Sequence, residues 1–211
     1  MNLYFVRHGE SEANTRHVIS NRESSFHLTP RGLEQAKALA EKIRNISFQA
    51  VFCSPVLRAR ETADVLSAAL GVPYHVTEAL REYDCGILEE KSDEQSWGTH
   101  RQYFEDWVLR KEYASKPEGG ECFLDIRDRF VPFVENLARA GTQRDENILL
   151  VGHGGLFLLM LPLVLTTIDH SFATALGMGN AEYVLARQES NGLVCLQWGE
   201  QILKRPEGFL S

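Results

Sequence analysis

Arg7, His8 and Gly9 follow one another near the start of the chain, directly after the apolar run 3–6. A neutral imidazole is a competent nucleophile toward phosphorus. The guanidinium of Arg7 offers a planar fork of N–H donors that suits a phosphate or a carboxylate. Gly9 allows a sharp backbone turn and the close approach of a ligand. The tripeptide makes His8 a candidate phosphoryl acceptor, and a structural histidine beside a buried strand is the alternative.

A second histidine, His153, stands in the same kind of setting. It lies in the glycine-rich stretch 151–155, between an apolar run and an apolar helical segment. Backbone N–H groups at a helix N-terminus favour an anion. Because sites in α/β sheets form at the carboxyl ends of strands, we expect His8 and His153 to share one crevice.

Arg58 supplies a second guanidinium. It belongs to the segment 54–63, in which Ser54-Pro55 follows an apolar run. A serine cap followed by proline predicts a helix start and places Arg58 in the first helical turn. Its N–H fork would then face the same anion as that of Arg7.

These residues need elements that bring them together, and apolar runs alternate with helical patterns along most of the chain. The runs 3–6, 49–53 and 148–151 are typical of buried strands. Helices are predicted from Thr29-Pro30 onward, from Ser54-Pro55 to about Leu70, around 123–137 and after 155. The stretch 181–198 predicts two strands joined at Asn191-Gly192. The pattern indicates an α/β fold, a three-layer α/β/α sandwich with a mostly parallel central sheet.

The length of 211 residues fits a single domain over 1–211. Segment 83–121 differs in composition, with ten acidic residues against five basic ones and six of the 20 aromatic residues. We interpret it as a short lid insertion, a lid or wall over the active site. Trp97, Phe104 and Trp107 within it are either lid contacts or a small satellite core.

Bulk properties narrow the function classes. The net charge of −7 argues against a nucleic-acid partner, which favours a basic face. Four scattered cysteines are typical of a thiol-reduced intracellular protein, so a cytoplasmic location is predicted. The N-terminus lacks signal-peptide features. The apolar stretch 148–165 is interrupted by glycines and by Pro162, so no membrane association is expected.

Ordered motifs spanning nearly the whole chain resemble the histidine phosphatase superfamily, the phosphoglycerate-mutase-like group. The matching segments are Arg7-His8-Gly9-Glu10-Ser11 with Asn14, Leu28-Thr29-Pro30-Arg31-Gly32, Ser54 to Ala63, Leu80-Arg81-Glu82 with Gly86, Gly119-Gly120-Glu121, and Val151 to Gly155.

The resemblance implies a role for each matched catalytic position. His8 would take the phosphoryl group and become phosphohistidine, while Arg7, Arg58 and His153 would hold the phosphoryl oxygens. Glu82 would protonate the leaving oxygen and then activate a water molecule, which requires a raised pKa. No metal or other cofactor is implied, because the arginines supply the positive charge.

The resemblance also places Asn14, Ser20 and Gly154 in the substrate-binding pocket. Asn14 and Ser20 have the alternative role of turn residues that make local backbone bonds. Glu10 and Glu61 are interpreted as partners that orient the arginines. The remaining histidines are expected at surface or boundary positions, with His17 as a minor substrate-contact candidate; these are His17, His27, His75, His100 and His170.

The superfamily contains phosphatases and mutases. A mutase needs extra cations for the carboxylate of phosphoglycerate, whereas segment 83–121 is acidic and Tyr83-Asp84-Cys85 follows Glu82. We therefore expect hydrolysis of a small phosphorylated metabolite; phosphoglycerate mutase and a non-catalytic phosphate-ligand binder are the alternatives. The C-terminal strands and the tail 204–211 carry no motif; they are expected either to pack at the edge of the sheet or to form the subunit contact of a homodimer.

Overall fold

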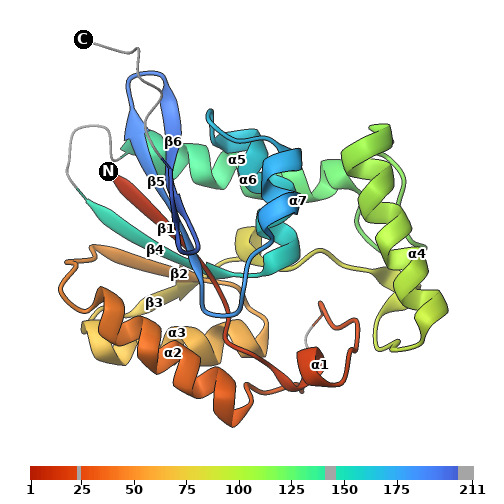
Figure 1. Ribbon diagram of the computed structural model, residues 1–211, viewed down its shortest axis with the longest axis horizontal. Coiled ribbons are helices and arrows are strands. Elements are labelled where there is room, and N and C mark those ends of the chain that lie inside the picture. Colours follow the sequence, from red (N-terminus) through yellow and green to blue (C-terminus); the bar gives the residue numbers. More distant parts are fainter. Residues whose placement is uncertain (23–24, 141–145, 204–211) are drawn as a thin grey trace.

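One sheet runs through the centre of the computed structural model, which describes residues 1–22, 25–140 and 146–203 (Figure 1). Within these residues the strand order is β3-β2-β4-β1-β5-β6-β7. Strands β1 to β4 are parallel, and β5 pairs antiparallel with β1. The strands are β1 (Asn2–Arg7), β2 (Ala50–Cys53), β3 (Tyr74–Val76), β4 (Asn147–Gly152), β5 (Tyr183–Glu189), β6 (Gly192–Trp198) and β7 (Gln201–Ile202).

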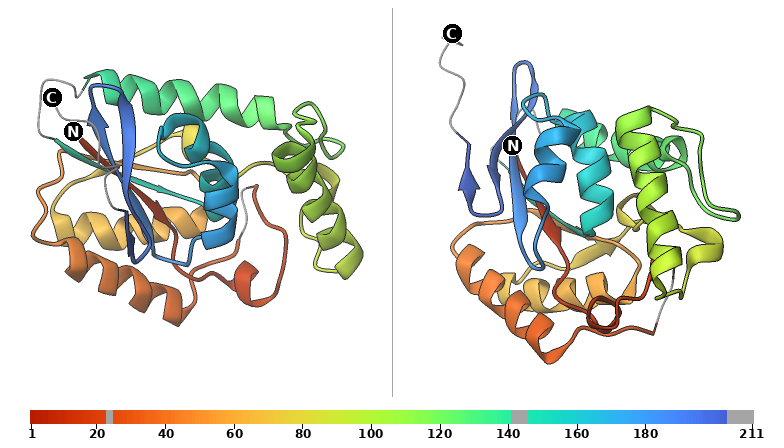
Figure 2. Two further views of the ribbon diagram at one scale, coloured as in Figure 1. Left: turned by 45° about the horizontal axis from the view of Figure 1, so that its top comes forward. Right: turned by 45° about the vertical axis from the view of Figure 1, so that its right-hand side comes forward.

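Helices cover both faces of the sheet, which confirms the α/β sandwich with a mostly parallel sheet (Figures 1 and 2). Helices α2 (Pro30–Ile43) and α3 (Leu57–Leu70) lie on one face. The opposite face carries α5 (Phe123–Ala140), α6 (Gly154–Val164) and α7 (His170–Leu176). The other elements are α1 (Glu12–Thr15), two 3₁₀ turns (Glu78–Leu80 and Gly86–Leu88), α4 (Glu94–Glu105) and a π-helical turn (Asp106–Arg110).

Alternating side chains of the central strands separate the core into two layers. Leu3 and Phe5 of β1 pack with the α5–α6 side, whereas Tyr4 and Val6 pack with α2 and α3. All four side chains are buried, so β1 reads as a continuous apolar run. This is the pattern of a parallel strand covered on both faces.

Two predicted helix starts have different outcomes. Thr29 caps α2 as predicted, accepting a hydrogen bond from the Gly32 N–H, with Pro30 as the first helical residue. The start of α3 was predicted too early, because Val56 is its N-cap. The Ser54 hydroxyl accepts from the Val56 N–H at 3.2 Å and so forms a turn before the helix. Arg58 still falls in the first turn, as predicted.

The apolar stretch 148–165 consists of β4, a turn at His153 and buried helix α6, as predicted. None of the helices among the described residues is long and apolar enough to cross a membrane. The predicted hairpin forms between β5 and β6. Short elements without a strong periodic signal, namely β3, β7 and α7, were not predicted, and the tail 204–211 lies outside the described residues.

Segment 83–121 extends to one side of the sandwich, where α4 stands apart from the sheet (Figure 1). Its aromatic residues divide between two surroundings. Trp107 is buried in the core cluster that also contains Phe130 of α5. Trp97 instead lines the pocket described below. That this segment moves as a lid stays a prediction.

Candidate active site

Adjacent strand ends bring the two predicted histidines together. Strands β1 and β4 pair in parallel with Arg7 opposite Gly152, and the His8 N–H donates to the Gly152 carbonyl at 3.0 Å. His8 and His153 therefore leave the sheet side by side, and their ring centroids lie 5.2 Å apart. Both side chains are buried. The two rings lie next to each other at the carboxyl ends of the strands.

The hydrogen bonds of His8 show which ring nitrogen carries the proton and which carries the lone pair. Nδ1 lies 2.7 Å from the Gly9 carbonyl oxygen, which can only accept, so Nδ1 carries the proton. Nε2 accepts a hydrogen bond from Nε of Arg58 at 2.9 Å. The lone pair of the imidazole therefore resides on Nε2.

Burial and neighbouring cations keep both imidazoles neutral. Burial, followed by the charges of Arg58 and Arg7, holds the pKa of His8 well below its ordinary value. The pKa of His153 is lowered for the same leading reason, burial, with Arg58 as the largest charge effect. A neutral ring retains the lone pair that a nucleophile needs.

Arg58 and Arg7 are each positioned by a hydrogen bond, Arg58 to Nε2 of His8 and Arg7 to a backbone carbonyl. Arg58 projects from the first turn of α3, is buried, and has its pKa lowered to about 10, mainly by burial. Nη1 of Arg7 donates to the carbonyl oxygen of Met178, in the loop before β5. Burial also lowers the pKa of Arg7, while Glu82 and Glu182 act in the opposite direction. Both groups remain cationic at neutral pH.

Glu82 faces this cationic region from the loop after the 3₁₀ turn 78–80. Its carboxylate accepts hydrogen bonds from the N–H groups of Tyr83 at 3.2 Å and Gly155 at 3.0 Å. The side chain is buried, and burial raises its pKa although Arg58 and the backbone donors oppose the shift. The raised pKa is the property expected of a proton donor near neutral pH.

Ser54 fixes the second histidine. Its Oγ lies 2.7 Å from Nε2 of His153 and already accepts from the Val56 N–H. The hydroxyl has no further acceptor among the described residues, so donation to Nε2 uses its proton. His153 is then protonated at Nδ1, an atom that is buried and has no hydrogen-bond partner within the described part of the chain.

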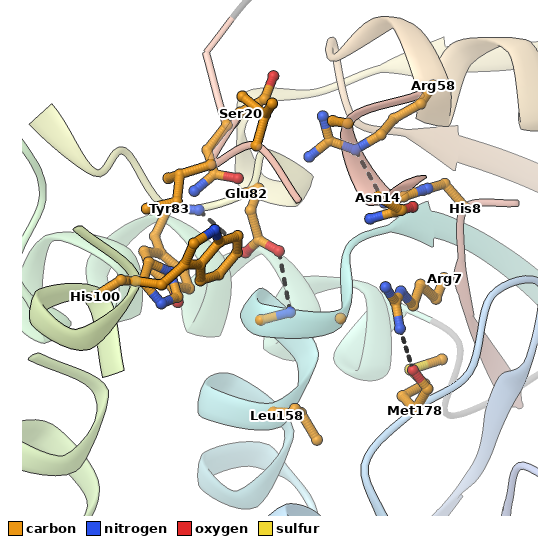
Figure 3. Close-up of a pocket in the computed structure, with 17 residues that line it drawn as sticks. Arg7, His8, Asn14, Ser20, Arg58, Glu82, Tyr83, His100, Leu158 and Met178 are labelled. Carbon is orange, nitrogen blue, oxygen red and sulfur yellow. Dashed lines mark hydrogen bonds between the residues drawn. The ribbon is translucent and has the colours of Figure 1, made fainter. Parts of the chain in front are cut away.

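A pocket of about 270 Å³ joins these groups (Figure 3). Its lining includes the predicted residues Arg7, His8, Asn14, Ser20, Arg58, Glu82 and Gly154. His153 is not among the lining residues; its fully buried ring lies beside that of His8. The structure thus places seven of the eight predicted site residues on the pocket wall and the eighth against them.

Several buried polar atoms around the pocket have no hydrogen-bond partner among the described residues. They are Nε of Arg7, Oγ of Ser20, Nη1 of Arg58 and Nδ1 of His153. Leaving a buried donor unpaired costs about 1–3 kcal/mol, so a concentration of such atoms indicates a place where a ligand completes the bonding. Each of these atoms can donate a hydrogen bond, which suits an oxyanion.

Asn14 and Gly154 contribute in different ways. The Asn14 carbonyl oxygen accepts from the backbone and hydroxyl of Ser11, so the local turn bonds considered for this residue do form. Its side chain nevertheless lines the pocket. A Cβ at Gly154 would lie 3.2 Å from Cδ and Nε of Arg7, so glycine lets this guanidinium pack tightly against α6.

Some interpretations from sequence were wrong. Glu10 and Glu61 do not contact Arg7 or Arg58: Glu10 accepts from the Thr29 hydroxyl at 2.7 Å, and Glu61 accepts from the Leu28 N–H at 2.7 Å. Both acids instead bind the residues that lead into α2, at Thr29 and Leu28.

Of the histidines outside the matched motifs, His17, His27 and His75 are exposed, as expected. His17, the minor substrate-contact candidate, does not line the pocket. His100, expected at a surface or boundary position, is half-buried, but it also lines the pocket and lies 2.9 Å from the Tyr83 hydroxyl, a site role that the sequence did not indicate. Sequence reasoning also missed Met178 and Ser54 as site residues, because no motif surrounds Met178 and Ser54 resembled a helix cap.

Comparisons with known proteins agree with this geometry. A sequence model of the histidine phosphatase superfamily (branch 1) matches residues 3–201 of the chain. The chain is 31% identical over 166 residues to an adenosylcobalamin/alpha-ribazole phosphatase of Salmonella typhimurium, covering 79% of this chain and 80% of that protein.

Two further relatives extend the comparison. The 6-phosphofructo-2-kinase/fructose-2,6-bisphosphatase of Gallus gallus is 36% identical over 155 residues, which are 72% of this chain but only 30% of that protein. The solved structure of a mycobacterial glucosyl-3-phosphoglycerate phosphatase with VO3 superposes with a TM-score of 0.79 at 24% identity, covering 95% of this chain and 99% of that one. At that identity the likeness establishes the fold.

Proposed function

Because the chain belongs to the histidine phosphatase superfamily, we propose that it hydrolyses a small phosphomonoester through a phosphohistidine intermediate on His8. Its relatives include phosphatases, which supports a hydrolase of phosphoric esters in general. The observation that carries the finer proposal is the position of Nε2 of His8, an unprotonated nitrogen between two guanidinium groups and in the same pocket as a carboxyl group with a raised pKa.

The first half-reaction follows from these groups. As substrate binds, Nε of Arg58 releases Nε2 of His8. The freed lone pair of Nε2 attacks phosphorus as the bond from phosphorus to the ester oxygen breaks. The leaving oxygen takes the proton of the Glu82 carboxyl group and departs as an alcohol. Arg7 and Arg58 donate to the phosphoryl oxygens, on which negative charge is concentrated during transfer. The Nδ1–H of His153 is a further donor beside the same ring.

The second half-reaction reverses the proton transfer. Glu82, now a carboxylate, takes a proton from a water molecule whose oxygen attacks phosphorus. The bond between phosphorus and Nε2 breaks, and inorganic phosphate leaves while His8 regains its lone pair. Every proton is accounted for by Glu82, so the cycle restores the starting state.

The pocket lining favours water over a second substrate hydroxyl as the acceptor. Among the described lining residues, Arg7 and Arg58 are the only lysine or arginine side chains, and both lie beside His8. A phosphoglycerate mutase also has to bind the carboxylate of its substrate, for which a further cation is expected. The charges therefore support hydrolysis of an ester with one phosphoryl group.

A panel of phosphomonoesters tests the proposal. We expect release of inorganic phosphate in the presence of a chelator and an acid-labile phosphoenzyme that can be trapped after rapid quenching. The His8→Ala variant should lose both signals, while His75→Ala, at an exposed histidine, provides the matched control. Transfer between the 2- and 3-positions of phosphoglycerate with little free phosphate would instead establish a mutase. Full activity of His8→Ala would exclude the phosphohistidine mechanism.

A further inference from the structure

A second and larger cavity, of about 970 Å³, lies between α4 with the following π-helical turn and α7. We call it the α4–α7 groove; the two helices that border it are shown in Figure 2. Phe104 and Val108 form its apolar side on the α4 segment. The opposite side includes His170, Thr174 and Ala175 of α7.

The groove begins where the phosphoryl pocket ends. Trp97 and His100 line both cavities. The ring centroids of Trp97 and His100 are 5.1 Å apart, and His100 stacks on Tyr83 with centroids 5.7 Å apart. These three rings form a continuous aromatic cluster that extends from the residue after Glu82 to the groove.

The direction of the reaction points the leaving group toward this surface. In phosphoryl transfer the attacking and leaving atoms are roughly in line, so the leaving oxygen lies opposite Nε2 of His8. Figure 3 shows Arg7, His8 and Arg58 on one side of the pocket, Tyr83 and His100 on the other, and Glu82 between them. An alcohol that takes its proton from Glu82 therefore extends toward Tyr83 and His100.

The charges of the groove differ from those of the phosphoryl pocket. Its lining contains two cationic residues, Arg101 and Lys111, and two acidic residues, Glu105 and Asp169, so their formal charges cancel. Burial lowers the pKa of His100 to about 4, which leaves its ring neutral at neutral pH. The groove thus offers an apolar and aromatic surface without an excess of positive charge for a second anionic group.

We propose that the α4–α7 groove binds the leaving group of the substrate, a small phosphomonoester whose uncharged alcohol has an apolar or aromatic part. This inference rests on the proposed phosphatase activity and specifies its substrate class. The alcohol would contact Trp97 and His100, which line both the phosphoryl pocket and the groove. A short polar or anionic alcohol would gain no contact with the apolar side chains of the groove.

Alkyl phosphates of matched chemistry test this substrate class. Propyl phosphate, 3-phenylpropyl phosphate and 4-phosphooxybutanoate are primary alkyl esters that differ mainly in the far end of the alcohol. We expect kcat/KM for 3-phenylpropyl phosphate to exceed that for propyl phosphate by about tenfold or more, through burial of the phenyl ring. The anionic ester should be no better than propyl phosphate.

A substitution that fills the groove with a larger side chain tests whether the groove causes the preference. Ala175→Trp places a large side chain at an exposed position of the groove wall and should bring the ratio of the two kcat/KM values toward unity. Leu176→Trp is the control, because Leu176 is exposed on the same helix but does not line the groove. It should retain the wild-type ratio.

Failure of the groove assignment and failure of the proposed phosphatase activity give different results. Equal kcat/KM values for the propyl and phenylpropyl esters, or a preference that Ala175→Trp leaves intact, would overturn the groove assignment while the His8-dependent hydrolysis stands. If none of the esters is hydrolysed in a manner that requires His8, the proposed function fails and the substrate class with it.

Discussion

Nε of Arg58 donates a hydrogen bond to Nε2 of His8 at 2.9 Å, deep enough that both side chains are buried. The bond fixes the plane of the imidazole from one side, and the Gly9 carbonyl fixes it from the other through Nδ1. The same contact discourages protonation of His8, because a second proton on Nε2 would face a guanidinium. Arg58 is thus placed both to orient the nucleophile and to keep it neutral.

Replacing Arg58 by lysine tests whether the positive charge alone is enough or whether the guanidinium geometry is required. Lysine retains a positive charge but lacks Nε and the planar fork. We expect kcat/KM of Arg58→Lys to fall about 10²–10³-fold, the range found when one preorganised oxyanion donor is removed. Steady-state kinetics with one phosphomonoester would measure this. Arg60→Lys, at an exposed position of the same helix, is the control, and equal kinetics for the two variants would contradict the role of Arg58.

The raised pKa of Glu82 predicts a pH dependence with a defined sign. The protonated carboxyl group is the active form for departure of a poor leaving group. Activity should therefore be present below the pKa of Glu82 and decline as pH rises through it. Glu82→Gln should remove this decline, which is checked by comparing pH profiles of kcat/KM for the two proteins on the same alkyl phosphate.

The leaving group provides an independent check on Glu82. An alkoxide needs a proton to depart, whereas 4-nitrophenolate does not. We expect Glu82→Gln to lose far more activity on an alkyl phosphate than on 4-nitrophenyl phosphate. An equal loss on both substrates would show that Glu82 is required for something other than proton donation.

Buried neutral histidines also predict how folding stability depends on pH. In the unfolded chain His153 protonates near its ordinary pKa of 6.5, whereas burial lowers its pKa in the folded protein. Its contribution to stability is therefore present above pH 6.5 and is lost as pH falls below that value, by about 1.4 kcal/mol per pH unit. The contribution of His8 to stability is also lost as pH falls, because its pKa is lowered in the folded protein as well.

Urea unfolding between pH 7 and pH 5 would measure this effect. The glutamine of His153→Gln can still accept from the Ser54 hydroxyl but does not titrate. The variant should show a shallower decline in the free energy of unfolding than the wild type. His75→Gln, at an exposed histidine, should follow the wild-type slope. Parallel curves for His153→Gln and the wild type would contradict a lowered pKa.

Features with a local cause could be predicted from the sequence. The strand ends that carry His8 and His153 follow from buried apolar runs that stop before Arg7 and Gly152, and a parallel sheet places such ends at one edge. The start of α2 follows from the chemistry of Thr29 and Pro30. The signal that ends each strand and the signal that starts α2 both lie within a few residues along the chain.

Features that depend on distant contacts could not be predicted in this way. Ser54 has the local signature of a cap, yet its hydroxyl contacts His153, 99 residues away. His100 enters the pocket because α4 packs near Tyr83, and nothing around residue 100 encodes that approach. Met178 supplies only a backbone carbonyl to Arg7, which any residue type can do. Glu10 and Glu61 were assigned to the wrong partners because charge alone does not specify direction.

Gly155 tests how closely Glu82 and Tyr83 are packed against α6. A Cβ at this position would lie 2.7 Å from Cε1 of Tyr83 and 2.9 Å from Oε2 of Glu82. The Tyr83 ring is buried and also contacts Trp107, so it has little room to move. In a helix alanine gains at most about 1 kcal/mol over glycine, whereas overpacking costs about 1–3 kcal/mol.

The clash therefore outweighs the helix propensity, and Gly155→Ala should lower the free energy of unfolding by about 1–2 kcal/mol. Displacement of the Glu82 carboxyl group should also reduce kcat/KM, most of all for alkyl phosphates. Gly98→Ala in α4 is the matched control: its Cβ would meet only Nη2 of Arg101 at 4.0 Å, so it should stabilise the protein by about 0.5–1 kcal/mol. A stabilised and fully active Gly155→Ala would show that Glu82 does not depend on this contact.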